Sequence, residues 1–156
     1  LFQYEGRIQM SCMNFEIKTA TTEDFNNVYP LFEQLWPNKE LNREALREVF
    51  ERGVSSQTDE LLCAVSDGSI VGFCAYAVVN NLWQEGAIAY VYAMVVDENF
   101  RGNGYGSKLI REVIARAKDK GLNRVELDSG FQREQAHRFY QKLGFEKRAY
   151  LFSYIV

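Results

Sequence analysis

Apolar and polar positions follow a strand period in some stretches of the chain and a helical period in others. Phe15 and Ile17 indicate a short first strand. A helix capped at Thr21 or Thr22 is predicted up to Pro37, and a second helix over residues 42–52, ended by Gly53. The expected inward faces of these two helices are formed by Phe25, Val28, Leu31, Phe32 and Leu35, and by Leu41, Leu46, Val49 and Phe50.

A β-hairpin is predicted by the dipeptide Asp67-Gly68, which separates apolar runs at 61–65 and 70–79. Both alternating faces of these runs are apolar, so we expect a sheet that is covered on both sides. An unbroken register around the two-residue turn makes Cys63 and Cys74 diagonal neighbours, about 7 to 8 Å apart. That separation is too large for a relaxed disulfide, and we expect free thiols.

The second half of the chain alternates strands and helices. Residues 87–96 read as a strand, 107–120 as an amphipathic helix ended by Gly121, and Val125 with Leu127 as a strand parallel to 87–96. Residues 135–143 predict a last helix and 149–156 a last strand. Without repeats or linkers, the chain predicts a single α/β (α+β) domain whose mixed, mostly antiparallel sheet has helices on both faces.

The composition of the chain limits the classes of function that it can have. The chain has 156 residues, of which 47% are hydrophobic and 25% charged, as in an ordinary folded domain. A net charge of -3 argues against nucleic acid as a partner, and no stretch is long and apolar enough to predict a membrane span. The three cysteines have no metal-ligand spacing, so we expect no metal site and a reduced, cytoplasmic protein. Residues 1–12 lack a clear period, and we expect a leader or added residues there, with the domain at 13–156.

A glycine-rich turn follows the strand at 87–96 and precedes the helix at 107–120. Glycine permits positive φ and close approach of a ligand to the main chain, and the first turn of a helix presents unpaired N–H groups. The turn therefore predicts a site for a phosphorylated cofactor. Its spacing fits neither the Walker loop nor the dinucleotide pattern. It reads Arg101, Gly102, Asn103, Gly104, Tyr105, Gly106 and Ser107.

This turn resembles the Gln/Arg-x-x-Gly-x-Gly/Ala loop of the GNAT superfamily of acetyl-CoA-dependent N-acetyltransferases. A second segment is similar to the Ala-x-x-Phe-Tyr-x-x-x-Gly-Phe motif of that superfamily, and the resemblance extends from Phe15 to the end of the chain. The matching residues of the second segment are Ala136, Phe139, Tyr140, Gly144 and Phe145.

The resemblance implies a GNAT fold and a cofactor, acetyl-CoA, with CoA as a product. It implies that backbone N–H groups of residues 102–107 hold the pyrophosphate, and that Met94, Val95 and Val96 pair with the pantetheine arm like an added strand. Parallel strands on either side of a glycine turn diverge where the turn leaves, and the freed backbone groups need a partner. Where the family often has Asn, three residues before its alanine, this chain has Arg133, which we expect to meet a phosphate.

The resemblance also implies that Tyr140 protonates the departing thiolate, and a phenol with a reference pKa of about 10 can do so at neutral pH. The acceptor amine must lose a proton before it attacks. The family often uses a Glu in the strand at 87–96, but this chain has no carboxylate at the matching positions. Candidate bases are Asp128, as first choice, Glu85, and an ordered water chain touching Tyr92.

The chain has a more specific resemblance, to aminoglycoside 6'-N-acetyltransferases. In those enzymes an acid at the position of Asp128, and a Leu-Trp-Pro segment like Leu35, Trp36 and Pro37, border the substrate site. We therefore expect an acyltransferase that moves an acetyl group from acetyl-CoA to a primary amine of a small molecule, such as an aminoglycoside or a polyamine, by direct attack. A protein or peptide acceptor, or a CoA-binding regulatory module without catalysis, is the alternative. The sequence leaves the acceptor, the acyl length and the choice between monomer and homodimer open.

Overall fold

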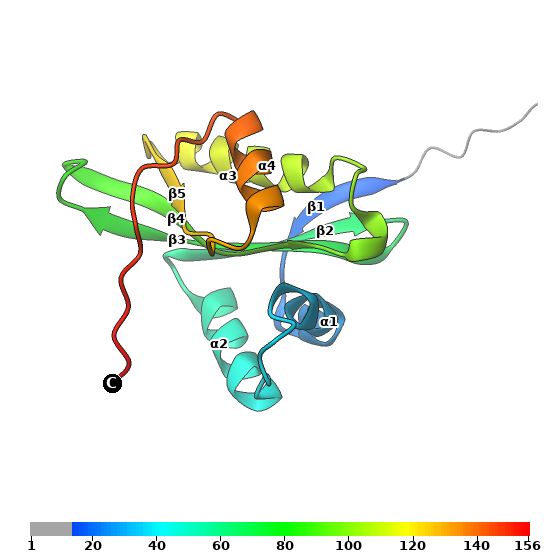
Figure 1. Ribbon diagram of the computed structural model, residues 1–156. Coiled ribbons are helices and arrows are strands. Elements are labelled where there is room, and N and C mark those ends of the chain that lie inside the picture. Colours follow the sequence, from blue (N-terminus) through cyan, green and yellow to red (C-terminus); the bar gives the residue numbers. More distant parts are fainter. Residues whose placement is uncertain (1–13) are drawn as a thin grey trace, which may run out of the picture.

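The computed structural model describes residues 14–156, in which one mixed sheet lies between two pairs of helices (Figure 1). Two short 3-10 turns, Thr22–Asp24 and Glu98–Phe100, precede α1 and α3. In chain order the elements are β1 (Phe15–Thr19), α1 (Phe25–Leu35), α2 (Arg43–Ser55), β2 (Asp59–Ser66), β3 (Ser69–Asn81), β4 (Gly86–Val96), α3 (Tyr105–Asp119), β5 (Val125–Leu127) and α4 (Glu134–Lys142).

The sheet has the order β1-β2-β3-β4-β5, with antiparallel pairs throughout except for the parallel pair of β4 and β5. This arrangement confirms the predicted fold class and the predicted parallel pair. The turn between β2 and β3 has positive φ at both central residues, 48° at Asp67 and 81° at Gly68, as a two-residue hairpin turn requires.

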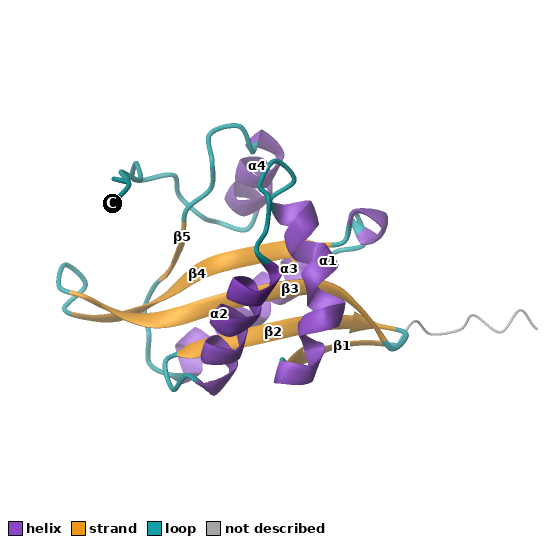
Figure 2. Cartoon of the chain, turned by 90° about the horizontal axis from the view of Figure 1, so that it is seen from below, coloured by secondary structure: helices purple, strands orange, loops and turns teal. Residues whose placement is uncertain are grey.

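Helices cover both faces of the sheet, as the apolar pattern of its strands predicts. α1 and α2 lie on one face and α3 and α4 on the other (Figures 1 and 2). Phe25, Val28 and Phe32 belong to the core on the α1 and α2 side, while Leu109 and Val113 belong to the core on the α3 side. The prediction for Val49 is wrong, since 48% of its surface is exposed.

The two cysteines are not diagonal neighbours as predicted, because β2 contains a β-bulge where it pairs with β3. The register between β2 and β3 shifts at Ala64 and Val65, so that Cys63 faces Phe73 and Leu62 faces Cys74. A shift by one residue exchanges the faces of a strand. Cys63 therefore lies in the core on the α1 and α2 side and Cys74 in the core on the α3 side. Both thiols are free, as expected, and burial raises the pKa of each to about 12.

Several element boundaries differ from the prediction by a few residues, and glycines explain two of these differences. α2 continues through Gly53 to Ser55, because this glycine serves packing rather than helix termination. A Cβ atom at position 53 would lie 2.8 Å from Leu61 Cδ1 of β2. α3 begins at Tyr105, two residues earlier than predicted, because Gly104 in the left-handed conformation caps it.

The predicted last strand at residues 149–156 is not formed. Strand structure requires a pairing partner, and within the described residues this segment has none, although its sequence suits a strand. The predictions for residues 1–12, and for Met13 as the first residue of the domain, lie outside the described residues.

Candidate active site

The parallel strands β4 and β5 separate at their carboxyl ends. Their pairing ends at Val91 and Leu127, whereas the pairing of β4 with β3 continues to Val96 and Gly72. A bulge marks the point of divergence, because Val91 pairs with Tyr76 and Ala93 pairs with Ala75, leaving Tyr92 as the extra residue. Within the described residues, β4 therefore has no neighbouring strand on the β5 side from Tyr92 to Val96. Backbone groups along such an edge can pair with an extended ligand.

The glycine turn leads from this edge into α3. Gly102 and Gly104 have φ values of 82° and 80°, and a Cβ atom at either position would meet nothing within 4 Å. Both positions thus require glycine for their backbone conformation. The hydrogen-bond ladder of α3 starts where the Lys108 amide donates to the Gly104 carbonyl at 3.1 Å, so the amides of Gly106 and Ser107 precede it. Amides in this position, together with the helix dipole, favour an anion.

Gly106 has a different role from the other two glycines. A Cβ atom there would lie 3.3 Å from Phe139 Cζ and 3.5 Å from Met94 Cε. The missing side chain lets the first turn of α3 pack against β4 and α4. Tyr105 beside it is a core residue, whose ring stacks on Phe15 with centroids 4.8 Å apart and whose hydroxyl bonds to Ser66 Oγ at 3.0 Å. The side chain of Tyr105 is therefore directed to the core, away from a ligand.

Polar side chains hold the rest of the turn in place. Arg101 Nε donates to the carbonyl of Val96 at 3.0 Å, and Asn103 Nδ2 donates to that of Phe100 at 3.0 Å. Gln34 of α1 donates through Nε2 to Asp97 at 3.2 Å, and its Oε1 accepts from the amide of Glu98 at 2.9 Å. The turn is thereby fixed to the end of β4 and to α1 before any ligand binds.

Tyr140 lies in α4 between two aromatic rings. Its ring centroid is 5.1 Å from that of Phe139 and 5.6 Å from that of Phe145. Burial raises the pKa of Tyr140 to about 12, with the positive charge of Arg133 acting in the opposite direction. The phenol consequently keeps its proton at neutral pH and can act as a donor.

Arg133 connects α4 to the end of α1. Its Nη2 donates to the carbonyl of Leu35 at 2.8 Å, immediately before Trp36. The indole of Trp36 packs against Phe32 with ring centroids 5.7 Å apart. Arg133 is thus held between α1 and α4 by its hydrogen bond to Leu35, and it is close enough to Tyr140 for its charge to lower the pKa of that phenol.

Asp128 follows β5 and accepts a hydrogen bond from the hydroxyl of Tyr90 on β4. Burial and this bond raise the pKa of Tyr90 to about 12. A cavity of about 1130 Å³ brings Tyr90, Asp128 and Tyr140 together, and Ser129 and His137 also line it. Ser129 Oγ is buried and has no hydrogen-bond partner in the described part of the chain, and His137 Nε2 lies 3.0 Å from the carbonyl of Gly130.

A second tyrosine and carboxylate meet nearby. Tyr92 donates to Asp59 Oδ2 at 2.8 Å, and burial together with this bond raises the pKa of Tyr92 far above its usual value. Val91 packs in the core on the α3 side, so its neighbours Tyr90 and Tyr92 face the α1 and α2 side. This face of β4 therefore carries two phenols, each bonded to a carboxylate.

The sequence reasoning missed Asp59 and Tyr90. Nothing in the pattern distinguishes Asp59 from an ordinary polar residue at the start of a strand, and its partner is 33 positions away. Glu85, in contrast, is not brought to this region. It lies in the turn between β3 and β4, seven residues before Tyr92, a separation of roughly 20 Å along a strand.

Similarity to known proteins extends over most of the chain. A family model described as Acetyltransferase (GNAT) family matches residues 25–145. An aminoalkylphosphonate N-acetyltransferase of Salmonella typhimurium is 30% identical over 138 residues, which cover 88% of this chain and 89% of that protein. An aminoglycoside N(6')-acetyltransferase type 1 of Stenotrophomonas maltophilia is 25% identical over 134 residues, covering 84% and 86%.

The structural comparison supports the same fold. A putative acetyltransferase from Agrobacterium tumefaciens superimposes with a TM-score of 0.80 at 24% identity, over 90% of this chain and 99% of that one. In the described residues, no helix is long and apolar enough to cross a membrane, and no cluster of three potential metal ligands occurs.

Proposed function

The chain belongs to the acetyltransferase (GNAT) family and is an acyltransferase, and from this premise we propose that it acetylates a primary amine of a small polycationic molecule with acetyl-CoA. The observation that carries the proposal is the separation of β4 from β5 directly before the N-terminus of α3. An unpaired strand edge beside an anion-binding helix end suits a ligand with amides and phosphates.

The residues of the turn and of β4 fit such a cofactor. The amides of residues 102–107 would hold the pyrophosphate, and the backbone of Met94, Val95 and Val96 would pair with the pantetheine amides. Arg101 in the turn and Arg133 at the start of α4 supply positive charge, as phosphate binding favours. Bound acetyl-CoA supplies the thioester carbonyl that the amine attacks.

Two groups in one cavity would handle the protons of the reaction. Asp128 would take the proton of the ammonium group, while Tyr90 holds the carboxylate in place through its hydroxyl. Tyr140, a phenol whose pKa of about 12 keeps it protonated, would give a proton to the thiolate. Because the amine attacks directly, no side chain needs to carry the acetyl group, and the buried Cys63 and Cys74 stay outside the reaction.

The acceptor would bind on the face of β4 that carries Tyr90 and Tyr92. Asp59 and Asp128 place two carboxylates there, which attract a molecule with several ammonium groups and repel one with a phosphate or phosphonate. This arrangement favours an aminoglycoside or a polyamine over an aminoalkylphosphonate, the substrate named for one relative. Trp36, at the end of α1, is proposed as a wall of the same site.

A release assay for free CoA with a panel of amines tests the proposal. The panel contains spermidine, an aminoglycoside, an aminoalkylphosphonate, glucosamine 6-phosphate and a peptide with a free N-terminus. We expect turnover of the polycations, and Asp59→Asn should raise their KM. The matched control is Glu33→Gln, which removes an exposed carboxylate of α1 and should leave KM unchanged.

Two outcomes would overturn parts of the proposal. Faster turnover of the phosphonate or the peptide than of either polycation would refute the acceptor class. Failure of CoA to bind by calorimetry would refute the cofactor site.

Replacing Tyr140 with Phe should lower kcat by about 100-fold or more, the usual contribution of a general acid, with little change in KM.

A further inference from the structure

Two arginines at the start of α2 converge on one side-chain oxygen of α1. Arg43 Nη2 and Arg47 Nη2 each donate to Asn26 Oδ1 at 3.0 Å. Two atoms at that distance from the same oxygen lie at most twice as far from each other, so the two positive charges are held close together. Their shared acceptor is an amide oxygen, which has no negative charge to balance them. Arg43 and Asn26 are exposed and Arg47 is half-buried, so this pair of charges is open to solvent.

Aromatic rings of α1 hold the two guanidinium groups in position. Arg47 Cζ lies 4.4 Å from the centroid of the Phe25 ring, and Arg43 Cζ lies 4.2 Å from that of Tyr29. Phe25 is buried and packs in turn against Phe50 of α2, with ring centroids 5.5 Å apart. A guanidinium group that rests on an aromatic face keeps the N–H groups along its edge available. Because the arginines are placed before a ligand arrives, less entropy is lost when it binds.

The positive charge at this point is not matched within residues 14–156. Neither Arg43 nor Arg47 makes an ion pair there. Glu51 is one turn beyond Arg47 on α2, at the spacing of a helical ion pair, yet the two are not paired. Arg43 is also the first residue of α2, where the helix dipole adds partial positive charge. Each guanidinium group has five N–H donors and uses one of them on Asn26.

We propose that Arg43 and Arg47 bind the phosphate dianion of a small soluble molecule, either a phosphomonoester or inorganic phosphate. The planar fork of N–H groups on a guanidinium matches two oxygens of a phosphate, and two such forks supply the two positive charges that balance the dianion. Asn26 lies between the two arginines and has an Nδ2 group with two further donors.

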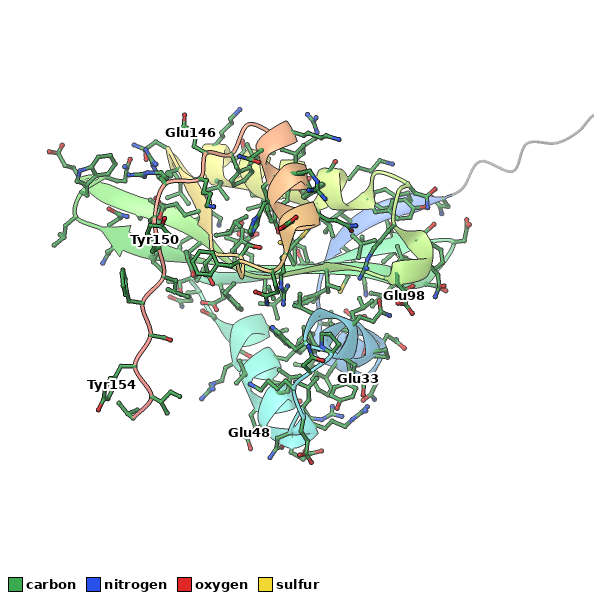
Figure 3. All side chains as sticks on the ribbon, in the orientation of Figure 1. Glu33, Glu48, Glu98, Glu146, Tyr150 and Tyr154 are labelled. Carbon is green, nitrogen blue, oxygen red and sulfur yellow. The ribbon has the colours of Figure 1, made fainter. Side chains whose placement is uncertain are left out.

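The charges around the two arginines favour a small ion over an anionic surface. Figure 3 shows Glu33 on α1 and Glu48 on α2, and α2 also carries Glu44 and Glu51. Anionic membranes attract clusters of several basic residues, and a membrane surface would be repelled by these carboxylates. A single phosphate needs to reach only the two guanidinium groups.

The position of the two arginines is separate from the proposed cofactor and acceptor sites. Asn26 is in the first turn of α1, and Trp36 follows the other end of that helix, about 15 Å away at the rise of an α-helix. Gln34, which bonds to the segment before the glycine turn, is near the same far end. A phosphate bound by Arg43 and Arg47 would therefore be additional to the phosphates of CoA.

Carbon-detected NMR of the arginine Cζ atoms in the full chain tests the proposal at the site itself. Inorganic phosphate and glycerol 3-phosphate are titrated separately at pH 7, above the second pKa of a phosphomonoester, about 6. We expect saturable shifts at Arg43 and Arg47, with a dissociation constant of about 1 mM or lower. Sodium chloride at the same ionic strength should not produce them. Arg52, an exposed arginine in the last turn of α2, should not shift with either phosphate.

In the variants, each arginine is removed in turn while the other reports on binding. Arg47→Gln should raise the dissociation constant measured at Arg43 by about tenfold or more, because a charged hydrogen-bond donor is lost, and Arg43→Gln should do the same at Arg47. The matched control Arg52→Gln removes the same charge from the same helix and should leave the constant unchanged. Circular dichroism confirms that each variant is folded. Shifts that do not saturate, or a constant that changes as much in Arg52→Gln as in the other two variants, would overturn the proposal.

Vesicles distinguish a soluble ligand from a lipid headgroup that carries the same phosphate. The full chain is sedimented with vesicles of phosphatidylcholine and with vesicles that also contain phosphatidic acid. We expect the chain to stay in the supernatant in both cases. Binding to the phosphatidic acid vesicles that Arg43→Gln abolishes and Arg52→Gln preserves would refute a soluble ligand.

Discussion

Replacing Gly104 with Ala tests whether the glycine turn holds the cofactor. Gly104 and Gly68 form a matched pair, with φ values of 80° and 81° and no atom within 4 Å of an added Cβ. The cost of either substitution is therefore backbone strain alone, about 1–2 kcal/mol. For a chain of this size that lowers the melting temperature by roughly 2–8 °C. Gly68→Ala in the β2 to β3 turn measures this cost away from the proposed site.

The two variants should differ in their affinity for CoA. Strain at Gly104 can relax only by turning the peptide groups that begin α3, which moves the amides of Gly106 and Ser107 away from a bound phosphate. If the misdirected amides cost about 1.4 kcal/mol of binding free energy, the dissociation constant for CoA becomes tenfold larger. We expect at least this change in Gly104→Ala and none in Gly68→Ala.

Titration calorimetry with CoA measures the affinity, and thermal melts with and without CoA give an independent check. At CoA concentrations about 100 times the dissociation constant, ligand binding stabilises the unaltered protein by about 2.7 kcal/mol. Gly68→Ala should gain the same amount and Gly104→Ala distinctly less. Equal CoA affinities in the two glycine variants would refute the proposal that this turn grips the pyrophosphate, and an unchanged melting temperature in both would refute the strain argument.

Three further predictions concern stability and ionisation. Asp24→Ala should lower the free energy of unfolding by about 1 kcal/mol, since Asp24 caps the turn before α1 and pairs with Lys18 at 2.7 Å. Burial alone would raise the pKa of Asp24, but the bond to Lys18 and the bonds to Thr21 outweigh it and lower that pKa. The stability that Asp24 contributes is therefore present above its unfolded pKa and is lost as pH falls through its folded pKa, which urea titrations at several pH values can follow. Cys63 and Cys74 should resist a thiol reagent in the folded protein and react only after unfolding, because both are fully buried and have pKa values of about 12; rapid labelling without denaturant would contradict this. The rate of acetylation should rise with pH as the amine loses its proton and should show no decline from Tyr140 until pH approaches its pKa of about 12, so a fall near pH 8 in a rate profile would exclude Tyr140 as the acid.

Much of the fold could be predicted because its signals are local. Asp67-Gly68 defines a hairpin by the φ values that its two residues can adopt. The helical spacing of residues such as Leu109 and Val113 predicts a buried face without knowledge of what covers it. The glycine turn could be located in the same way, since its chemistry depends on consecutive backbone groups.

The site could be predicted only in part, because its side chains meet across the sheet. Asp128 was a candidate from its place at the end of a strand, but its bond to Tyr90 depends on the register of β4 and β5. The bond between Asp59 and Tyr92 spans 33 positions and joins β2 to β4 across β3. No local pattern in the sequence encodes such a pairing.

The sequence by itself determined the order of the elements, the hairpin, the glycine turn and the family, because each follows from residues close together along the chain. The tertiary structure decided which residues share a face. A bulge of one residue places Cys63 and Cys74 on opposite sides of the sheet, since side chains alternate with a period of two and a single shift inverts them. It also decided that the apolar residues at 149–156 form no strand within their own chain, because a strand exists only where another supplies its hydrogen bonds.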